Sequence, residues 1–215
     1  KELLAGGVLL DGEALRSLDE MGLAHLVGVA LGQSYDSDTQ EIFSDDPLNR
    51  HYGGWKRDCR ESFRWWNVTA HELIPLGKET ATLARIADYQ GRDRGASLTT
   101  FENELGGRVA VTSYFPWTMN MSAAKREQMV WLCEWLSRGT MPVTIETFVR
   151  ITPWVRRHPD GRMVIGLLNL SGDTYESVEI AVRADAKHFQ QLNVDGTFKP
   201  LHAQRDSDAV QLLVS

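Results

Sequence analysis

Residues 97–139 read SLTTFENELGGRVAVTSYFPWTMNMSAAKREQMVWLCEWLSRG, and this stretch decides how the fold is interpreted. Two runs typical of β-strands, 98–102 and 108–114, flank a Gly-Gly pair at positions 106 and 107 that favours a turn. The stretch contains no arrangement of residues that performs chemistry. It predicts the closing elements of a domain and leaves the function to other parts of the chain.

A helix is expected after these strands. Ser122 suits the N-cap, because its hydroxyl can accept a hydrogen bond from the first helical turn. The apolar stripe that marks the core face follows the i, i+3, i+4, i+7 spacing and consists of Met129, Leu132, Cys133 and Leu136. Gly139 and Pro142 stop the helix, which we predict to end near Arg138.

The N-terminal part predicts a strand followed by a helix. Residues 7–10 (GVLL) form a wholly apolar run, which is typical of a buried parallel strand. Asp11 is placed to cap a helix over about residues 13–21, and Gly22 suits its C-terminal end. Further strands are expected at 68–76 and 80–89, with a turn at 91–95.

Residues 32–67 form a polar segment that is rich in Asp, Arg and Gly and has no regular period, yet it is unusually aromatic. A long segment of this kind is often functional or interfacial. Its candidate ligand or interface residues are Tyr52, Trp55, Trp65 and Trp66. They can contact a neighbouring domain or subunit, pack in the core of their own domain, or stack on a sugar ring, and we favour the interface.

The pattern after Pro142 is β throughout. Six short candidate strands are separated by turn signals, at 143–151, 154–157, 163–169, 177–183, 189–194 and 209–214. Short strands at this spacing are typical of an antiparallel β-sandwich. We therefore predict an α/β domain over 1–141 and a β-sandwich domain over 142–215.

Composition excludes several classes of function. The net charge of −6 argues against sequence-independent nucleic-acid binding, which needs a basic face. No apolar run approaches the ~20 residues that span a bilayer, and the sequence shows no signal-peptide pattern, so we expect a cytoplasmic protein without a membrane partner. The six histidines are dispersed and no phosphate-binding glycine loop occurs, so we expect no metal and no cofactor. The chain opens on Lys1 rather than Met, and we expect it to be part of a longer protein.

The sequence predicts no catalytic residues. Cys59 lies between Arg57 and Arg60, whose charges can lower the pKa of a thiol, but it lacks the glycine-flanked turn of a nucleophile elbow. Two acidic pairs, at positions 11 and 13 and at 102 and 104, invite comparison with the carboxylates of glycosidases. Capping or solvated roles explain these four carboxylates better.

Three segments carry a resemblance to a known family: residues 6–15 (GGVLLDGEAL), residues 101–111 (FENELGGRVAV) and the helix with Trp135-Leu136. They resemble the C-terminal region of bacterial glycoside hydrolases similar to family 42 β-galactosidases. In that family a catalytic (β/α)8 barrel is followed by a flavodoxin-like domain similar to class I glutamine amidotransferases, and then by a small β-sandwich. The resemblance covers most of residues 1–140, and for 143–215 it rests on position and strand pattern.

The resemblance implies a three-layer, flavodoxin-like α/β domain before the sandwich. The chain contains no barrel, where the family has its catalytic glutamates, and no strands that would form the N-terminal half of an amidotransferase-like domain. The resemblance thereby implies that this chain is a non-catalytic accessory or oligomerisation region of a carbohydrate-active enzyme. It also implies a homo-oligomer, and a partner that is either an upstream catalytic barrel or a neighbouring subunit. The alternatives are a carbohydrate-binding module that uses the aromatic residues of 50–66 or the sandwich, and a stand-alone thiol hydrolase or amidotransferase.

Overall fold

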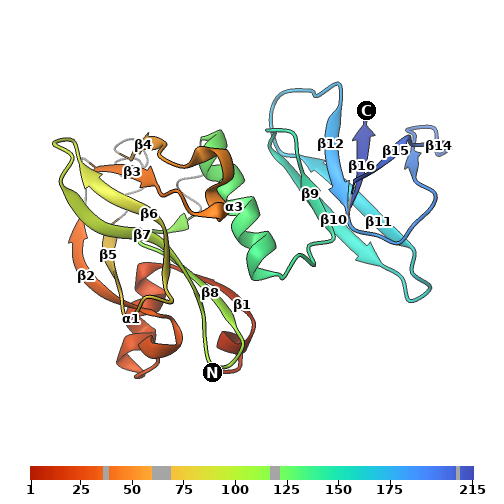
Figure 1. Ribbon diagram of the computed structural model, residues 1–215. Helices are drawn as coiled ribbons and strands as arrows, with labels where there is room; N and C mark the ends of the chain where they lie inside the picture. Colours follow the sequence, from red (N-terminus) through yellow and green to blue (C-terminus); the bar gives the residue numbers. More distant parts are fainter. Residues whose placement is uncertain (36–38, 60–68, 117–121, 207–208) are drawn as a thin grey trace. The chain divides into compact units, whose positions relative to one another are not determined.

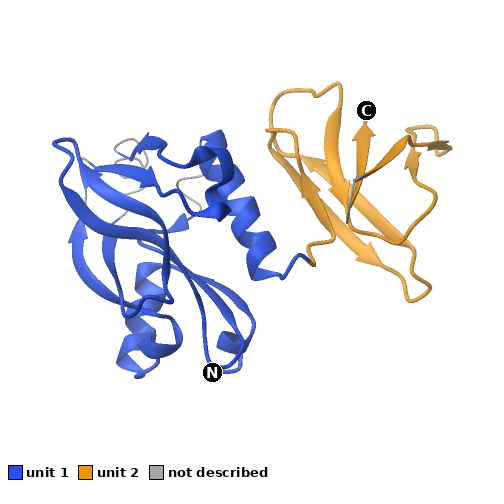
Figure 2. Ribbon diagram, in the orientation of Figure 1, with its two compact units in different colours: residues 1–139 blue, residues 140–215 orange. Residues whose placement is uncertain are grey.

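The computed structural model describes residues 1–35, 39–59, 69–116, 122–206 and 209–215. The chain divides into two compact units, Lys1–Gly139 and Thr140–Ser215 (Figure 2). β-Strands dominate both units (Figure 1). No helix in these ranges is both long enough and apolar enough to cross a bilayer.

Unit 1 is built on an eight-stranded sheet. Its main path runs β1 (Gly7–Leu10), β8 (Arg108–Thr112), β7 (Asp93–Glu102), β6 (Ala81–Asp88), β3 (Thr39–Phe43) and β4 (Lys56–Asp58). A branch consists of β2 (Val29–Tyr35) and β5 (Ala70–Pro75), and β5 joins β7 where Leu73 pairs with Ala96. Among the described strand pairs of this sheet, β1 and β8 are parallel and the others are antiparallel.

This topology contradicts the predicted flavodoxin-like, three-layer α/β domain. A flavodoxin-like domain has a parallel sheet whose strands are joined by helical crossovers, whereas here antiparallel pairs make up most of the sheet. The apolar run at 7–10 does form a parallel strand, and β8 is its parallel partner among the described strands. It is less buried than predicted, since Gly7 is exposed and residues 8–10 are half-buried. The chain is instead mainly β, with a sandwich-like arrangement of sheets.

The error arose mainly in the segment that had no visible period. Strands β2, β3 and β4 and the 3₁₀ segment η3 (Pro47–Tyr52) all lie between residues 29 and 58. Side chains on β3 alternate between buried and half-buried, but the buried ones are Thr39, Glu41 and Phe43. Two polar residues at inward positions conceal the alternation by which strands are recognised. The turn expected at 91–95 was also too long, since β7 already begins at Asp93.

The first predicted helix is confirmed as α1 (Gly12–Glu20). Asp11 caps it, and its Oδ1 accepts a hydrogen bond from the Ala14 amide at 2.8 Å. Leu15 is fully buried and belongs to a hydrophobic cluster with Val109 and Val111 of β8. Short 3₁₀ segments, η1 (Leu3–Ala5) and η2 (Ala24–Leu26), flank this part of the unit.

The second predicted helix is confirmed as α3 (Ala123–Leu136), whose N-cap is Ser122. The Ser122 hydroxyl accepts a hydrogen bond from the Lys125 amide at 3.2 Å. Met129, Leu132 and Leu136 are buried, and Cys133 is half-buried. The cluster around α3 includes Ala110 of β8, the neighbour of the two valines beneath α1. Because successive side chains of a strand point to opposite faces, α1 and α3 cover opposite faces of the sheet at β8.

Unit 2 consists of antiparallel strands. Its four-stranded sheet runs β15 (Ala203–Asp206), β16 (Ala209–Val214), β12 (Val178–Val182) and β9 (Val143–Ile145). Two hairpins complete it: β10 (Ile151–Arg157) with β11 (Met163–Asn169), and β13 (Gln190–Leu192) with β14 (Phe198–Pro200). Ile180 and Val182 of the sheet share a core with Val155 and Ile165 of the first hairpin. The β-sandwich predicted for this region agrees with that arrangement.

The close approach of β1 to the end of α3 gives a stability prediction. A Cβ at position 7 would lie 2.2 Å from the carbonyl oxygen of Leu136. Gly7→Ala should therefore lower the free energy of unfolding by about 1–3 kcal/mol, the usual cost of overpacking. Urea unfolding followed by tryptophan fluorescence measures this, in a Trp154→Phe background that leaves all remaining tryptophans in residues 1–139.

Gly6→Ala is the matched control for Gly7→Ala. A Cβ at position 6 would lie 3.5 Å from the nearest atom, the carbonyl oxygen of Leu3, which is an ordinary contact. Its backbone is extended, with φ at −100°. Equal unfolding midpoints for the two variants would contradict the packing of α3 against β1.

Candidate functional site

A buried carboxylate organises the interior of unit 1. Glu41, on β3, accepts a hydrogen bond from the Arg57 guanidinium at 2.7 Å through Oε2. Its other oxygen, Oε1, accepts from the Lys125 Nζ at 3.0 Å. The side chains of Glu41 and Lys125 are both 0% exposed. A charged pair this deep in a domain is unusual and needs full hydrogen bonding to be tolerated.

Two hydroxyl groups complete the set of donors around this carboxylate. Ser97 Oγ and Tyr114 OH donate to Glu41 Oε1 at 3.0 and 2.8 Å. Arg57 also donates to the Tyr114 hydroxyl oxygen, at 3.2 Å. We call Glu41, Arg57, Ser97, Tyr114 and Lys125 the Glu41 cluster. Its members come from β3, β4, β7, the residue pair after β8, and α3, so one carboxylate links five parts of the unit.

The polar network continues from the Glu41 cluster to η3. Lys125 Nζ donates to Gln128 Oε1 at 2.8 Å, and Gln128 Nε2 donates to Asn49 Oδ1 at 2.6 Å. Asn49 Nδ2 in turn donates to the carbonyl oxygen of Leu83 on β6 at 2.7 Å. Helix α3 is thereby attached by side-chain hydrogen bonds to the segment that carries Tyr52.

The electrostatics of the cluster hold Glu41 ionised. Burial by itself raises the pKa of a carboxyl, but Lys125 and Arg57 lower it more, and the pKa falls to about 2. Burial lowers the pKa of Lys125, against the opposite effect of Glu41. Burial also raises the pKa of Tyr114, which keeps its hydroxyl as a donor. A carboxylate held so far from neutrality and enclosed by donors suits a structural anchor, because a general acid or base needs a pKa near the working pH.

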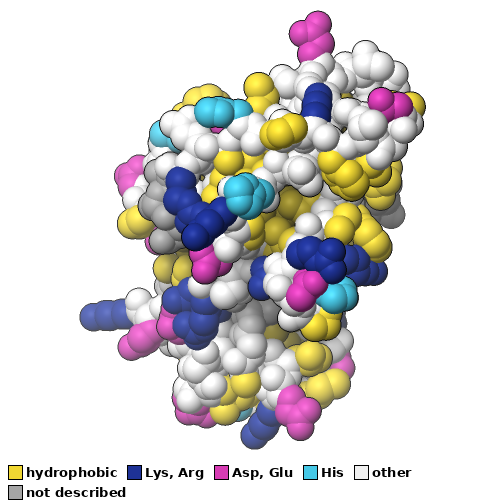
Figure 3. All heavy atoms as spheres, turned by 90° about the vertical axis from the view of Figure 1, so that its right-hand side faces the viewer, with side chains coloured by type: hydrophobic (Ala, Val, Ile, Leu, Met, Phe, Trp, Pro, Cys, Tyr) yellow, Lys and Arg dark blue, Asp and Glu magenta, His cyan; other side chains and the backbone are white. Residues whose placement is uncertain are grey.

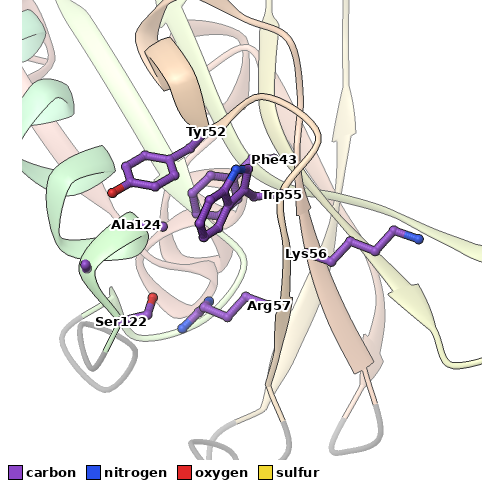
Figure 4. A pocket seen from close by; sticks show the side chains of 8 residues that line it. Phe43, Tyr52, Trp55, Lys56, Arg57, Ser122 and Ala124 are labelled. Atoms are coloured by element: carbon purple, nitrogen blue, oxygen red, sulfur yellow. The ribbon is translucent and has the colours of Figure 1, made fainter.

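A pocket of about 230 Å³ lies beside the Glu41 cluster (Figure 4). It is lined by Phe43, Tyr52, Trp55, Lys56, Arg57, Ser122, Ala123 and Ala124. The rings of Tyr52 and Trp55 meet edge to face, with centroids 4.9 Å apart and planes at 85°. In Figure 4 the Arg57 side chain points toward the start of α3, whereas Lys56 points away from the other labelled side chains.

The structure places two of the four aromatic candidates in this pocket. Tyr52 is buried and donates its hydroxyl to Glu127 Oε1 at 3.3 Å. Trp55 is 55% exposed. Trp65 and Trp66 lie outside the described residues. The structure thus brings Tyr52 and Trp55 together and says nothing of the other pair.

The environment of Cys59 opposes its use as a nucleophile. Its side chain is fully buried, and burial raises its pKa to about 12, with a further contribution from Glu41. Arg57 does act in the lowering direction, as expected from the sequence, but burial outweighs it. Since the thiolate is the reactive species, this position disfavours the thiol hydrolase alternative.

Three of the four acidic residues compared with glycosidase carboxylates have local partners. Asp11 caps α1, and Glu13 Oε1 lies 3.0 Å from His71 Nε2. Glu102 forms an ion pair with Arg108 at 2.7 Å, and its side chain is 53% exposed. Within the described ranges, no three His, Cys, Asp or Glu side chains gather closely enough to hold a metal ion.

Sequence reasoning missed the Glu41 cluster, although one signal for it was present. Lys125 lies four residues before Met129 and seven before Leu132, on the apolar stripe of the helix. A lysine on a core-facing stripe requires a buried counter-charge. Glu41 could not be recognised in the same way, because the segment around it shows no hydrophobic period that would mark its position as inward-facing.

The fold is similar to that of a solved enzyme. α-L-Fucosidase isoenzyme 2 from Paenibacillus thiaminolyticus superposes with a TM-score of 0.65 at 12% sequence identity. The match covers 98% of this chain and 35% of the fucosidase chain, so this chain spans about a third of the length of that enzyme. At this identity the likeness shows a shared fold. No protein-family model and no curated protein matches the sequence.

The Glu41 cluster predicts a large difference between two glutamate substitutions. Glu41→Gln should lower the free energy of unfolding by about 3–5 kcal/mol, because the buried Lys125 ammonium loses its carboxylate. Glu102→Gln removes the exposed pair with Arg108 and should cost less than about 1 kcal/mol. Urea unfolding of both variants measures the two costs.

The pH dependence of the Glu41→Gln effect provides a further check. The pKa of Glu41 is lowered from 4.5 to about 2, so its stabilisation is present above pH 4.5 and is lost as the pH falls toward 2. The difference in the free energy of unfolding between wild type and Glu41→Gln should therefore become smaller as the pH falls from 4.5 to 2. Equal losses of unfolding free energy in Glu41→Gln and Glu102→Gln would refute the buried pairing. A difference between wild type and Glu41→Gln that does not change with pH would refute it as well.

Proposed function

We propose that this chain is an accessory region of a glycoside hydrolase and carries no catalytic residues of its own. The observation that supports this most is the shared fold with α-L-fucosidase isoenzyme 2, since both units of this chain match about a third of that enzyme. Because the match leaves about two thirds of the fucosidase chain uncovered, this chain is comparable to a region that accompanies a catalytic domain.

The resemblance to the C-terminal region of family 42-like enzymes supports the same class. Two of its three sequence segments, 6–15 and 101–111, lie side by side in the structure, because β1 pairs with β8 from Gly7↔Arg108 to Leu10↔Val111. The catalytic partner is then a barrel domain in the same polypeptide or in a neighbouring subunit. The parent reaction would be retaining glycoside hydrolysis by two carboxylates of that barrel.

Two observations favour a role in assembly over one in catalysis: the buried ionisable groups are unsuited to chemistry, and apolar side chains are exposed on the surface. The buried acid is enclosed by donors, and Cys59 is held as a thiol. The described residues of unit 2 also expose large hydrophobic side chains, among them Phe148, Val164, Leu168, Leu170, Leu192, Val194, Phe198 and Leu213. On the face shown in Figure 3, hydrophobic groups alternate with acidic and basic ones. Exposed apolar groups rimmed by charge are typical of protein contact surfaces.

Two measurements on the purified chain test this proposal. Incubation with a panel of aryl glycosides, α-L-fucosides and β-D-galactosides included, should give no hydrolysis above the buffer rate. Sedimentation velocity over a concentration series should show reversible self-association. Hydrolysis that scales with protein concentration and disappears in a single carboxylate variant would overturn the non-catalytic role. A monomer throughout the series would overturn the role in self-assembly.

A further inference from the structure

We propose that the pocket between Trp55 and the start of α3 binds one neutral pyranose ring of a glycan. This inference rests on the proposed function, because it assigns to the accessory region a sugar contact of its own. The volume, about 230 Å³, is below the ~300–1,000 Å³ of pockets that enclose drug-sized ligands. A space of this size accommodates a single ring and leaves the rest of a chain outside.

The aromatic walls of the pocket match the apolar surface of a sugar ring. A pyranose presents C–H groups on its flat faces and hydroxyl groups around its edge. The Trp55 indole is half exposed, and Tyr52 stands at 85° to it, so the two rings form a corner. Phe43, 2% exposed, adds an apolar wall. Aromatic side chains of this type combine large contact area with a fixed geometry.

Polar groups for the edge of the ring come from Arg57 and Ser122. The Ser122 oxygen accepts the hydrogen bond of the Lys125 amide, which leaves the hydroxyl hydrogen as a donor. Arg57 is held at 2.7 Å by Glu41, so its charge is compensated while its guanidinium stays in a fixed orientation. A compensated cation favours hydroxyl groups over a carboxylate, and this is why we assign a neutral sugar.

The Glu41 cluster prepares the pocket before a ligand arrives. It joins β4, which carries Arg57, to α3, which begins after Ser122. Arg57 and the start of α3 are therefore held in place in the free protein, which reduces the entropy that binding must overcome. Glu41 acts here as a positioning residue.

The exposed tryptophan of unit 2 offers a contrast. The Trp154 indole lies against Gly166, with its Cε3 3.7 Å from the place of a Cβ at that position. The Arg156 guanidinium lies over the same ring, 4.3 Å from its centroid. With these two neighbours the ring is less available for stacking than Trp55, and it serves as the matched control.

Titration of the full chain with defined sugars tests the assignment. The probes are L-fucose, D-galactose, D-glucose and lactose, with D-galacturonic acid as the anionic counterpart of galactose, and isothermal calorimetry gives the affinities. At least one neutral sugar should bind. Trp55→Ala should weaken that binding by about tenfold or more, and Trp154→Ala should leave it unchanged. Independently of any variant, the indole N–H resonance of Trp55 should shift in NMR spectra on addition of that sugar.

Each other outcome overturns the assignment in a defined way. Absence of binding by every neutral sugar, or unchanged binding in Trp55→Ala whatever the effect of Trp154→Ala, removes the pocket as the site. Tighter binding of galacturonic acid than of galactose would show that the pocket prefers an anionic sugar and would overturn the assignment of a neutral one. A chain that self-associates without hydrolysing glycosides, and binds no sugar, keeps the accessory role and loses the sugar pocket.

Discussion

The hydrogen bonding of one buried carboxylate is the constraint on which unit 1 depends. An ionised carboxylate inside a protein is costly unless donors surround it. Glu41 receives them from β4, β7, the residue pair after β8 and α3. Because these elements are far apart in sequence, the carboxylate is satisfied only when they meet. The Glu41 cluster therefore forms only in an arrangement of the chain that brings these elements together.

The same constraint connects the fold to the proposed role. Arg57 belongs both to the Glu41 cluster and to the wall of the aromatic pocket, and Lys125 lies in the first turn of the helix that forms the opposite wall. The pocket is therefore a consequence of how the buried charge is satisfied. An accessory region needs a rigid surface to present to a sugar or a partner, and an anchored helix beside a short strand provides one.

The sequence predicted helices α1 and α3 and failed at β3, where most of the inward positions are polar. It also missed β2, β14 and β15, and it placed the break between β9 and β10 too late. Helices α1 and α3 are recognisable from their caps and apolar stripes, and β11 and β16 as short strands separated by turn signals. Strand β3 was missed because two of its three inward residues, Thr39 and Glu41, are polar. That omission allowed the resemblance to a flavodoxin-like domain to decide the fold class wrongly. Tyr52 and Trp55 can be recognised as aromatic residues in a polar segment. The polar residues beside them, Arg57 and Ser122, can be identified only once the packing of α3 against that segment is known.

Native-state hydrogen exchange tests most directly whether the Glu41 cluster couples helix α3 to the sheet. Local opening of a helix is seen as exchange at a free energy below that of global unfolding. The account predicts that the amides of residues 126–130 on α3 exchange with the same opening free energy as those of residues 40–42 on β3. Exchange of the α3 amides through a separate opening of much lower free energy, with β3 still protected, would contradict it.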